Sequence, residues 1–418
     1  MKDKIDEKIL GEKIFGEVER LRDDMVAALS RICRIPAVSP HNGGTGEEEK
    51  AREIEKLVAE LGFGKVEWQR VDDGKSPTGS RSSLFLEYEG ASPRRLCILT
   101  HTDIVPEGDL SLWTHDPYAP VVEGGRLYGR GVSDNGMSLI ASLYALKALS
   151  NLKVVPAFTV CLGFLADEEM GSAYGIRPLV ERGLFRQDDL VIAPDGGNEK
   201  GDFIEISEKS GLKLEFAVTG RQAHASMPHT GLNACRVANL LSVELDDALH
   251  KAFLEEDALF SPPSSTFEPT RRFANVPNLN TVPGKERFGF DCRVLPSVPL
   301  DDVIAVAERV KNEVARRTGA VIDLEIGRSD AAPPTPAESD IVRLLSGSVK
   351  EVLGVEPTLG GIGGGTFAAF FRRKGIPAVV WQQECDTAHQ PDEYEEIPHI
   401  VNNAKVFASM MTDGFKTI

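Results

Sequence analysis

Histidines and carboxylates stand at the ends of several predicted strands. An apolar run from Phe158 to Leu165 predicts a buried strand, and the run stops abruptly at three adjacent acids, Asp167, Glu168 and Glu169. Partly buried carboxylates are costly unless something neutralises their charge. Either these acids spread into water, or a cation lies beside them.

Three further strand ends and one turn carry the same residue types. In open α/β sheets, ligands bind outside the carboxyl ends of the strands, so side chains at these places are predicted to lie close together. The residues that they contribute are His101, Asp103, Asp134, Asp195 and His389.

This mixture of imidazole and carboxylate suits zinc, with cobalt or manganese as alternatives. Two metals about 3.5–4 Å apart need two terminal ligands each and a bridge between them. The inventory therefore predicts a cofactor of two Zn²⁺ ions. The predicted ligands are His101 and Asp195 on one metal, Glu169 and His389 on the other, and Asp134 as the bridge.

Two carboxylates near these ligands have other predicted roles. Side chains at i and i+2 of a strand point the same way, so Asp103 is predicted to lie behind His101 and orient its ring. Adjacent residues at a strand end point to opposite sides, so one of Glu168 and Glu169 binds a metal. The other faces the metal's water and takes its proton. The spacing does not decide which glutamate does which.

Alternating strands and helices must position these residues. Near-continuous apolar strands separated by helices predict an α/β fold with a mainly parallel sheet, covered on both faces. Apolar residues at helical spacing from Ile5 to Ile32 predict one long N-terminal helix. Thr45 and Glu48 predict a capping box at the start of the second helix.

The pattern changes near Gly211. A strictly alternating strand is followed by a helix, two strands, a helix and a last strand, which is the β-α-β-β-α-β order of a ferredoxin-like domain. We predict that this domain, residues 212–329, is inserted into a metal-binding catalytic domain made of residues 1–211 and 330–418. The segment from Asp330 to Ser339 is the predicted return linker.

Composition limits the partners. The chain has 418 residues, which suggests two or three domains, and a formal net charge of −17. This charge argues against nucleic acid or an anionic membrane as a partner. No stretch is apolar enough to span a bilayer, and the N-terminus lacks the pattern of a signal peptide. The six cysteines are far apart, so they are predicted to be reduced thiols in a cytoplasmic protein.

The motifs resemble those of a known family. H-T-D-I-V-P, G-R-G-V-S-D-N-G, A-D-E-E-M-G-S, A-P-D-G-G and A-H-Q-P-D-E are similar, in this order, to motifs of the zinc-dependent peptidase and deacylase family. That family contains acetylornithine deacetylase, succinyl-diaminopimelate desuccinylase, aminoacylases and dipeptidases, and the resemblance covers nearly the whole chain. It implies that Glu168 is the general base, that Glu169 is a ligand, and that a cis peptide bond follows Asp134.

The resemblance also extends to the inserted domain. It implies that this domain closes over the site and mediates a homodimer, and that His224 stabilises the oxyanion of a small-molecule substrate. In N-L-N-T-V-P-G and D-C-R-V-L-P, Asn280 and Arg293 are candidates for holding a substrate carboxylate or carbonyl. A structural ion pair is an equal alternative for Arg293.

A glycine-rich loop, Gly360–Thr366, lies where the family has a loop that contacts the substrate backbone. Gly364 and Thr366 are its predicted substrate-binding residues. The family usually carries an acid directly after the Ser or Thr, whereas this chain has Phe367, which leaves the substrate contacts of the loop open. The acidic run from Asp392 to Glu396 is predicted to be a solvated surface turn.

These residues predict metal-dependent hydrolysis of an amide bond in a small carboxylate-bearing substrate, an N-acyl amino acid of the acetylornithine or succinyl-diaminopimelate type. A di- or aminopeptidase of the same family is the alternative, and Asp195 is more typical of its aminopeptidase, dipeptidase and aminoacylase members. A catalytically silent metal-binding scaffold is an alternative of another class. Glu168 argues against a scaffold, which needs ligands but no base.

Overall fold

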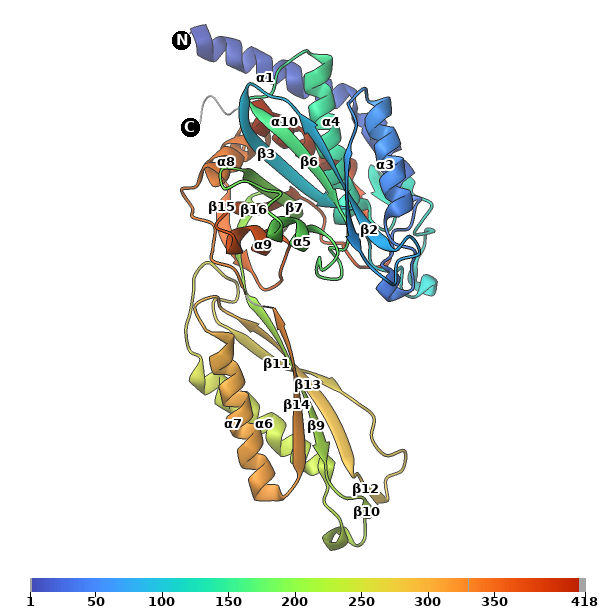
Figure 1. Cartoon of the computed structure of the whole chain (residues 1–418), viewed down its shortest axis with the longest axis vertical. Helices are drawn as coiled ribbons and strands as arrows, with labels where there is room; N and C mark the ends of the chain where they lie inside the picture. Colours follow the sequence, from blue (N-terminus) through green and yellow to red (C-terminus); the bar gives the residue numbers. More distant parts are fainter. Residues whose placement is uncertain (1, 330, 413–418) are drawn as a thin grey trace. The chain divides into compact units, whose positions relative to one another are not determined.

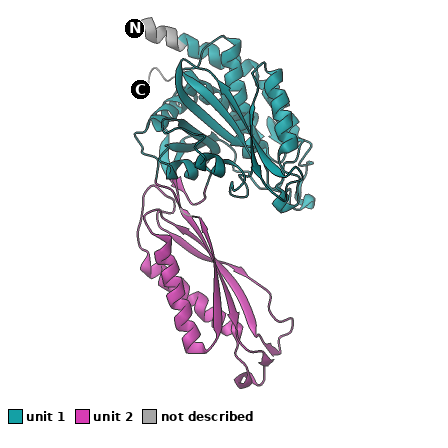
Figure 2. Cartoon of the chain, viewed as in Figure 1, with its two compact units in different colours: residues 1–206, 334–360, 366–418 teal, residues 207–333, 361–365 magenta. Residues whose placement is uncertain are grey.

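The computed structural model describes residues 2–329 and 331–412, and side chains from Ile9 onward. The chain divides into two compact units, which are coloured separately in Figure 2. Asp330, the first residue of the predicted linker, lies outside the described residues. Unit 1 consists of Met1–Ile206, Pro334–Gly360 and Thr366–Ile418, and unit 2 of Ser207–Pro333 and Gly361–Gly365.

An eight-stranded sheet forms the centre of unit 1, in the order β1-β2-β6-β3-β7-β16-β8-β15. Neighbouring strands in the run β6-β3-β7-β16 are parallel, whereas β1, β2 and β8 add on antiparallel. The predicted α/β class with a parallel central sheet is confirmed. The bounds are β1 (Glu67–Asp72), β2 (Ser80–Tyr88), β3 (Ser92–His101), β6 (Phe158–Leu165), β7 (Leu190–Asn198), β8 (Phe203–Glu208), β15 (Thr358–Ile362) and β16 (Ala378–Gln383).

Helices cover both faces of this sheet, which explains why its central strands are apolar on both sides. The helices α1, α4, α8 and α10 pack together, with α4 and α10 lying against the sheet (Figure 1). On the opposite face, α5 and α9 pack on alternate strand residues such as Cys97, Leu99 and Val191. The bounds are α4 (Met137–Asn151), α5 (Ile176–Glu181), α8 (Asp340–Leu353), α9 (Ala368–Arg373) and α10 (Ile397–Thr412).

The N-terminal helix is divided in two, contrary to the prediction of one long helix. The segments are α1 (Lys2–Arg20) and α2 (Arg22–Cys33). The N–H of Leu21 approaches both the Glu17 and Val18 carbonyl oxygens, at 3.2 and 3.1 Å, so the turn tightens there without losing its hydrogen bonds. The apolar stripe that suggested one helix continues through the junction because Leu21 is itself buried.

The predicted capping box is wrong. Helix α3 (Glu48–Glu60) begins three residues after Thr45, and its N-cap residue, Glu47, makes no side-chain cap. Both glutamates are engaged elsewhere. The Glu47 carboxylate accepts a hydrogen bond from Arg81 Nε at 2.7 Å, and the Glu48 carboxylate accepts one from Ser82 Oγ at 2.6 Å. Tertiary pairing with β2 therefore replaces local capping.

Unit 2 has the predicted β-α-β-β-α-β order. Its antiparallel sheet runs β11-β13-β9-β14, and alternate residues of β9, among them Leu214 and Phe216, are buried in one apolar core with α6 and α7. The Asn233 side chain caps α6 by accepting the Arg236 N–H. The bounds are β9 (Ser210–Thr219), α6 (Ala234–Ala252), β11 (Thr266–Arg272), β13 (Lys285–Val294), α7 (Leu300–Thr318) and β14 (Val321–Ser329).

Two small sheets complete the architecture. In unit 2, β10 (Ala223–His224) pairs with β12 (Thr281–Val282), and in unit 1, β5 (Arg126–Tyr128) lies between β4 (Val121–Glu123) and β17 (Tyr394–Glu396). Among the described residues, we find no helix with the length and apolarity needed to cross a bilayer.

Candidate metal centre

The five predicted ligands come from four strand ends and one turn of unit 1. His101 is the last residue of β3, Glu169 follows β6, Asp195 lies within β7, and His389 follows β16. These four strands are parallel neighbours, so their carboxyl ends share one edge of the sheet. Asp134 reaches the same edge from the turn η3 (Val132–Gly136), which precedes α4.

The ligands form two groups of three that share Asp134. In the first group, His101 Nε2 lies 2.8 Å from Asp134 Oδ1 and 3.1 Å from Asp195 Oδ1. In the second, His389 Nε2 lies 3.0 Å from Asp134 Oδ2 and 3.1 Å from Glu169 Oε2. The ligand atoms within each group lie within 4.8 Å of one another. The two oxygens of Asp134 thus face different histidines, as a bridging carboxylate requires.

The donor set fits a pair of cations. Each group offers one imidazole nitrogen and carboxylate oxygens, which is the chemistry that zinc, cobalt and manganese accept. The peptide bond between Asp134 and Asn135 is cis, which confirms the expectation from the family resemblance. Together the two groups provide two terminal ligands for each of two metals and one shared carboxylate.

Negative charge exceeds positive charge at this site. Burial raises the pKa of Glu169 and Asp195, and burial together with the Asp195 charge raises the pKa of Glu168 well above its usual value. Hydrogen bonds that the His389 ring donates to the Asp134 and Glu169 carboxylates raise the pKa of His389 to about 10. A metal needs neutral imidazole ligands, so binding at this site would be coupled to the release of protons.

Asp103 orients His101 through a different atom than predicted. The backbone oxygen of Asp103 lies 3.0 Å from His101 Nδ1, whereas its carboxylate is 3.6 Å away from that nitrogen. The carboxylate instead accepts the N–H groups of Glu168 and Glu169, at 3.0 and 3.1 Å. Strand β3 ends at His101, so the period-two rule no longer applies two residues later. The carbonyl contact selects the tautomer that leaves Nε2 free to bind a metal.

The acids after β6 have separate partners. Asp167 adopts a positive φ of 64° and accepts a hydrogen bond from Arg81 Nη1 at 2.9 Å. The Arg81 side chain is fully buried and also pairs with Glu47. Sequence reasoning did not single out Arg81. Its position in β2 gave no signal, because its partner carboxylates are distant in the chain.

The acidic run Asp392–Glu396 is not a solvated turn, contrary to the prediction. The side chains of Glu393 and Glu395 are 0% exposed. Glu393 pairs with Arg130 Nη1 at 2.6 Å and accepts backbone N–H groups of the loop that carries Asp134. Glu395 accepts the Ser133 hydroxyl at 3.0 Å. Their spacing of two residues around Tyr394 is the one signal in the sequence that these side chains share a face.

A third cluster of possible ligands, Cys385, Glu395 and His399, is buried in unit 1. The Glu395 carboxylate accepts the Cys385 N–H at 3.0 Å and His399 Nδ1 at 2.7 Å, in addition to Ser133. Because protein donors already surround this carboxylate, we interpret the cluster as a structural hydrogen-bond network.

His224 and Asn280 are neighbours in unit 2. His224 is exposed, pairs with Thr281 in the β10–β12 ladder, and its Nδ1 lies 2.7 Å from Ser226 Oγ. The Asn280 carbonyl accepts the N–H of Ala225 at 2.9 Å. The two residues predicted to contact the substrate thus lie in adjacent backbone segments, and their contact with substrate stays a prediction.

Arg293 and the glycine-rich loop also meet. Arg293 Nε donates to Asp291 Oδ1 at 2.6 Å, and Nη1 donates to the carbonyl of Gly363, next to Gly364. The ion pair considered as an alternative is therefore present, and a role in substrate binding stays a prediction. Thr366 Oγ1 accepts the N–H of Ala368 at the start of α9. Phe367, which replaces the family's acid, is buried in the core against α5.

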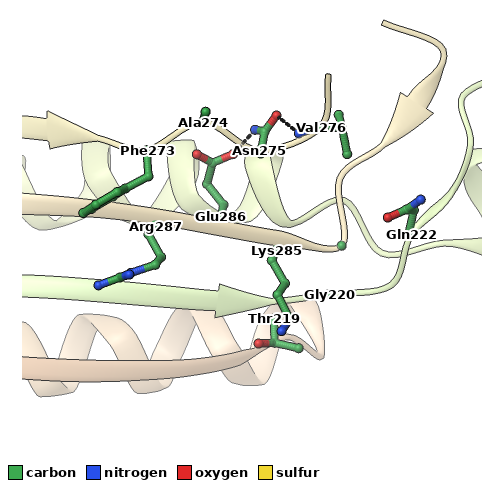
Figure 3. Close-up of a pocket in the computed structure, with 11 residues that line it drawn as sticks. Thr219, Gly220, Gln222, Phe273, Ala274, Asn275, Val276, Lys285, Glu286 and Arg287 are labelled. Atoms are coloured by element: carbon green, nitrogen blue, oxygen red, sulfur yellow. Dashed lines mark hydrogen bonds between the residues drawn. The ribbon is translucent and has the colours of Figure 1, made fainter. Parts of the chain in front are cut away.

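A hollow of about 500 Å³ lies beside β13 in unit 2. Its lining includes Phe273, Lys285 and Arg287, and Figure 3 shows the Arg287 side chain beside the Phe273 ring. The Asn275 amide donates to Glu286, a contact drawn as a dashed line in Figure 3. None of the residues predicted to bind substrate lines this hollow, so the hollow is separate from the substrate contacts predicted within unit 2.

The fold and the paired donor groups are those of a metallohydrolase, and comparison with known proteins agrees. The model of peptidase family M20/M25/M40 matches residues 97–413, and the chain belongs to this family. An uncharacterized metallohydrolase of Methanococcus maripaludis is 36% identical over 417 residues, covering 94% of this chain and 100% of that protein. The predicted family and enzyme class are confirmed.

Solved structures share the fold. An M20 family metallo-carboxypeptidase from Sulfolobus solfataricus superposes with a TM-score of 0.72 at 20% identity, covering 93% of this chain and 98% of the other. A dinuclear metal-binding M20 peptidase from Bacillus subtilis gives a TM-score of 0.65 at 16% identity, with coverage of 96% and 100%. At these identities the likeness establishes the fold alone.

Proposed function

We propose that this protein hydrolyses an amide bond in a small, carboxylate-bearing substrate with a pair of zinc ions. One observation carries the proposal: Asp134 directs its two carboxylate oxygens to two different histidine-containing ligand groups. The dinuclear metal described for the Bacillus subtilis structure supports the same arrangement. Cobalt or manganese suits these ligands equally by donor type.

Five side chains would hold the metal pair. Bound there, the two ions would supply Lewis acidity toward the amide carbonyl and lower the pKa of an attacking water. The chain's part is to fix the positions, through Asp103 behind His101 and through the hydrogen bonds around Asp134. The proposed ligands are His101, Asp134, Glu169, Asp195 and His389.

Glu168 is the proposed general base. Asp103 accepts the N–H groups of both glutamates, so the backbone that places Glu168 is fixed together with the backbone of the ligand Glu169. Burial raises the pKa of Glu168, which suits a carboxylate that takes a proton from water and returns it to the leaving amine. Proton transfer by such a group typically contributes about 10²–10⁴-fold in rate.

Unit 2, together with the adjoining Thr366 of unit 1, is proposed to complete the site. His224 would donate to the carbonyl oxygen as negative charge develops on it, and Asn280 and Arg293 would hold the substrate's polar groups, with Gly364 and Thr366 against its backbone. A donor of the His224 kind is worth about 3–4 kcal/mol in other hydrolases. We further propose that unit 2 is the lid and the homodimer contact, and that the protein works in the cytoplasm.

N-acyl amino acids are the first proposed substrate class, and short peptides the second. Two observations favour peptides. The first is that the M20 structure from Sulfolobus solfataricus is named as a carboxypeptidase, and the second is that the dinuclear one from Bacillus subtilis is named as a peptidase. Asp195 is more typical of aminopeptidase, dipeptidase and aminoacylase members, so it is compatible with both classes. The planar fork of Arg293 suits the free carboxylate that both classes possess.

Metal content and turnover test the proposal together. We expect two metal ions per chain by elemental analysis, and hydrolysis of at least one member of a panel of N-acyl amino acids and dipeptides. Glu168→Gln should keep both ions and lose about 10²–10⁴-fold in kcat. Glu181→Gln, the same change on the exposed face of α5, is the control and should leave kcat unchanged.

Two outcomes would contradict parts of this proposal. Wild-type protein that binds two metals and cleaves nothing in a broad panel would favour the scaffold alternative. Full turnover by Glu168→Gln would assign the base to another residue.

A further inference from the structure

Glu393 is a buried carboxylate four residues after the proposed ligand His389. It lies just before β17, and its side chain is fully enclosed in unit 1. One cation faces it, because Arg130 Nη1 donates to Oε2 at 2.6 Å. Arg130 is itself buried and lies 5.1 Å from the centre of the Trp113 ring. The Trp113 ring therefore packs against the arginine of this buried pair.

The other oxygen of Glu393 receives three backbone donors from one loop. Oε1 accepts the N–H groups of Gly131, Ser133 and Asp134, at 3.1, 3.0 and 3.1 Å. Converging amides of this kind form an anion-binding nest, and here the anion is a side chain of the same protein. Gly131 has a φ of 80°, which L side chains rarely adopt, and this turn directs the three N–H groups inward.

The last of these three donors belongs to the shared ligand itself. The Asp134 N–H is held by Glu393, while the Asp134 carboxylate reaches His101 with one oxygen and His389 with the other. One short segment, 389–393, therefore carries a ligand of the second group and the anchor of the carboxylate that joins both groups. Displacing the anchor would move Asp134 relative to both histidines.

We propose that Glu393 is a positioning residue that, neutralised by Arg130, holds the Asp134 backbone so that its carboxylate spans both metal positions. The inference rests on the proposed two-metal function. Among the described residues, the Glu393 carboxylate bonds to Arg130 and to backbone N–H groups, and to no ligand side chain, so its effect is exerted through the backbone.

The neighbouring residue Asp392 offers a matched control. Its carboxylate accepts the Thr114 N–H at 2.8 Å and the Thr114 hydroxyl at 2.9 Å, so it also holds a loop in place, the one that contains Thr114. That loop contains no proposed ligand. Asp392→Asn and Glu393→Gln thus remove the same charge from the same turn, and only Glu393→Gln disturbs the Asp134 loop.

The test is metal binding by the full chain, measured by titration of metal-free protein with Zn²⁺ and Co²⁺. For Glu393→Gln, we expect the second ion to bind about 10–100-fold more weakly, as for other changes in groups that orient ligands. The electron paramagnetic resonance spectrum of the di-cobalt form should lose the magnetic coupling that a bridging carboxylate transmits. Asp392→Asn should match the wild type in both measurements.

The outcomes separate this inference from the proposed function. Wild-type protein that binds fewer than two ions would overturn the two-metal function and this inference with it. Wild-type protein with two coupled ions, and Glu393→Gln with the same affinities within twofold and the same coupling, would overturn this inference alone. If Glu393→Gln does not fold, Glu393→Asp, which keeps the charge but is one methylene shorter, must weaken the second ion or the inference is wrong.

Discussion

Two acidic runs of unit 1 look alike in the sequence and are neutralised in different ways. The run Asp167–Glu169 follows a buried strand and directs side chains toward a fully buried arginine and toward histidines that form the ligand groups. The run Asp392–Glu396 directs its buried members, Glu393 and Glu395, toward backbone N–H groups, with Arg130 as a partner of the first.

The difference teaches that a buried carboxylate has more than one route to stability. A cation or a set of hydrogen-bond donors can replace the water that it loses. The first run leaves Glu168 and Glu169 beside the ligand histidines, where a metal can bind. In the second run, the buried oxygens are already occupied by protein donors, and the run serves to hold the loop of Asp134.

The largest effect is expected from Glu169→Gln in the first run. Removing a charged ligand from the His389 group should reduce the metal content from two ions to one. The loss of turnover should exceed the roughly 10²–10⁴-fold expected for the adjacent base variant Glu168→Gln. Elemental analysis and kcat on the same preparations check this, and equal metal content in the two variants would contradict the separate roles.

Arg81→Met should destabilise unit 1 strongly. It leaves Asp167 and Glu47 charged and without their buried cation, a change that typically costs about 3–5 kcal/mol. All three tryptophans, Trp68, Trp113 and Trp381, lie in unit 1, so urea unfolding followed by tryptophan fluorescence reports on this unit.

Arg177→Met is the control for this measurement. Arg177 pairs with Glu181 on the exposed face of α5, and such pairs contribute less than about 1 kcal/mol. Similar midpoints for the two variants would show that the Arg81 cluster does not stabilise the fold.

Metal binding should strengthen as the pH rises. The pKa of His389 is raised to about 10, and the charges of Asp195 and Asp134 raise the pKa of His101, so both rings bind a proton more tightly in the metal-free site than a free imidazole does. A metal requires the neutral rings, so binding releases those protons and weakens as the pH falls.

Calorimetric titration in two buffers with different ionisation enthalpies measures the number of protons released at pH 7. We expect at least one, from His389, and each proton released gives about a tenfold change in affinity for each pH unit. A release of no protons would show that the histidines are neutral before the metal binds.

The smallest expected effect is the difference in unfolding free energy between variants of a buried and of a more exposed glutamate in the second run. Glu395→Gln leaves donors from Cys385, Ser133 and His399 facing an amide, and should cost about 1–3 kcal/mol of unfolding free energy. Glu396→Gln removes a more exposed pair with Arg126 and should cost less than about 1 kcal/mol. A larger cost for Glu396→Gln would reverse the assignment of buried and surface roles.

Much of the scaffold could be predicted because its signals are local. The strand Phe158–Leu165 has the predicted bounds, and unit 2 has the predicted order of strands and helices. The grouping of the predicted ligands followed from a rule about strand ends in parallel sheets. The capping box failed because its acid, Glu48, found a tertiary partner on β2 instead of a local one.

The sequence by itself determined which residues have ligand chemistry, in what order they occur, and which elements present them at one edge of the sheet. Only the tertiary structure decided what neutralises each acid. Arg130 and Glu393 are 263 residues apart, and Arg81 and Asp167 are 86 apart. The sequence shows which residues carry a carboxylate. The partners of each carboxylate are brought near it only when the sheet has formed and the loops around it have closed.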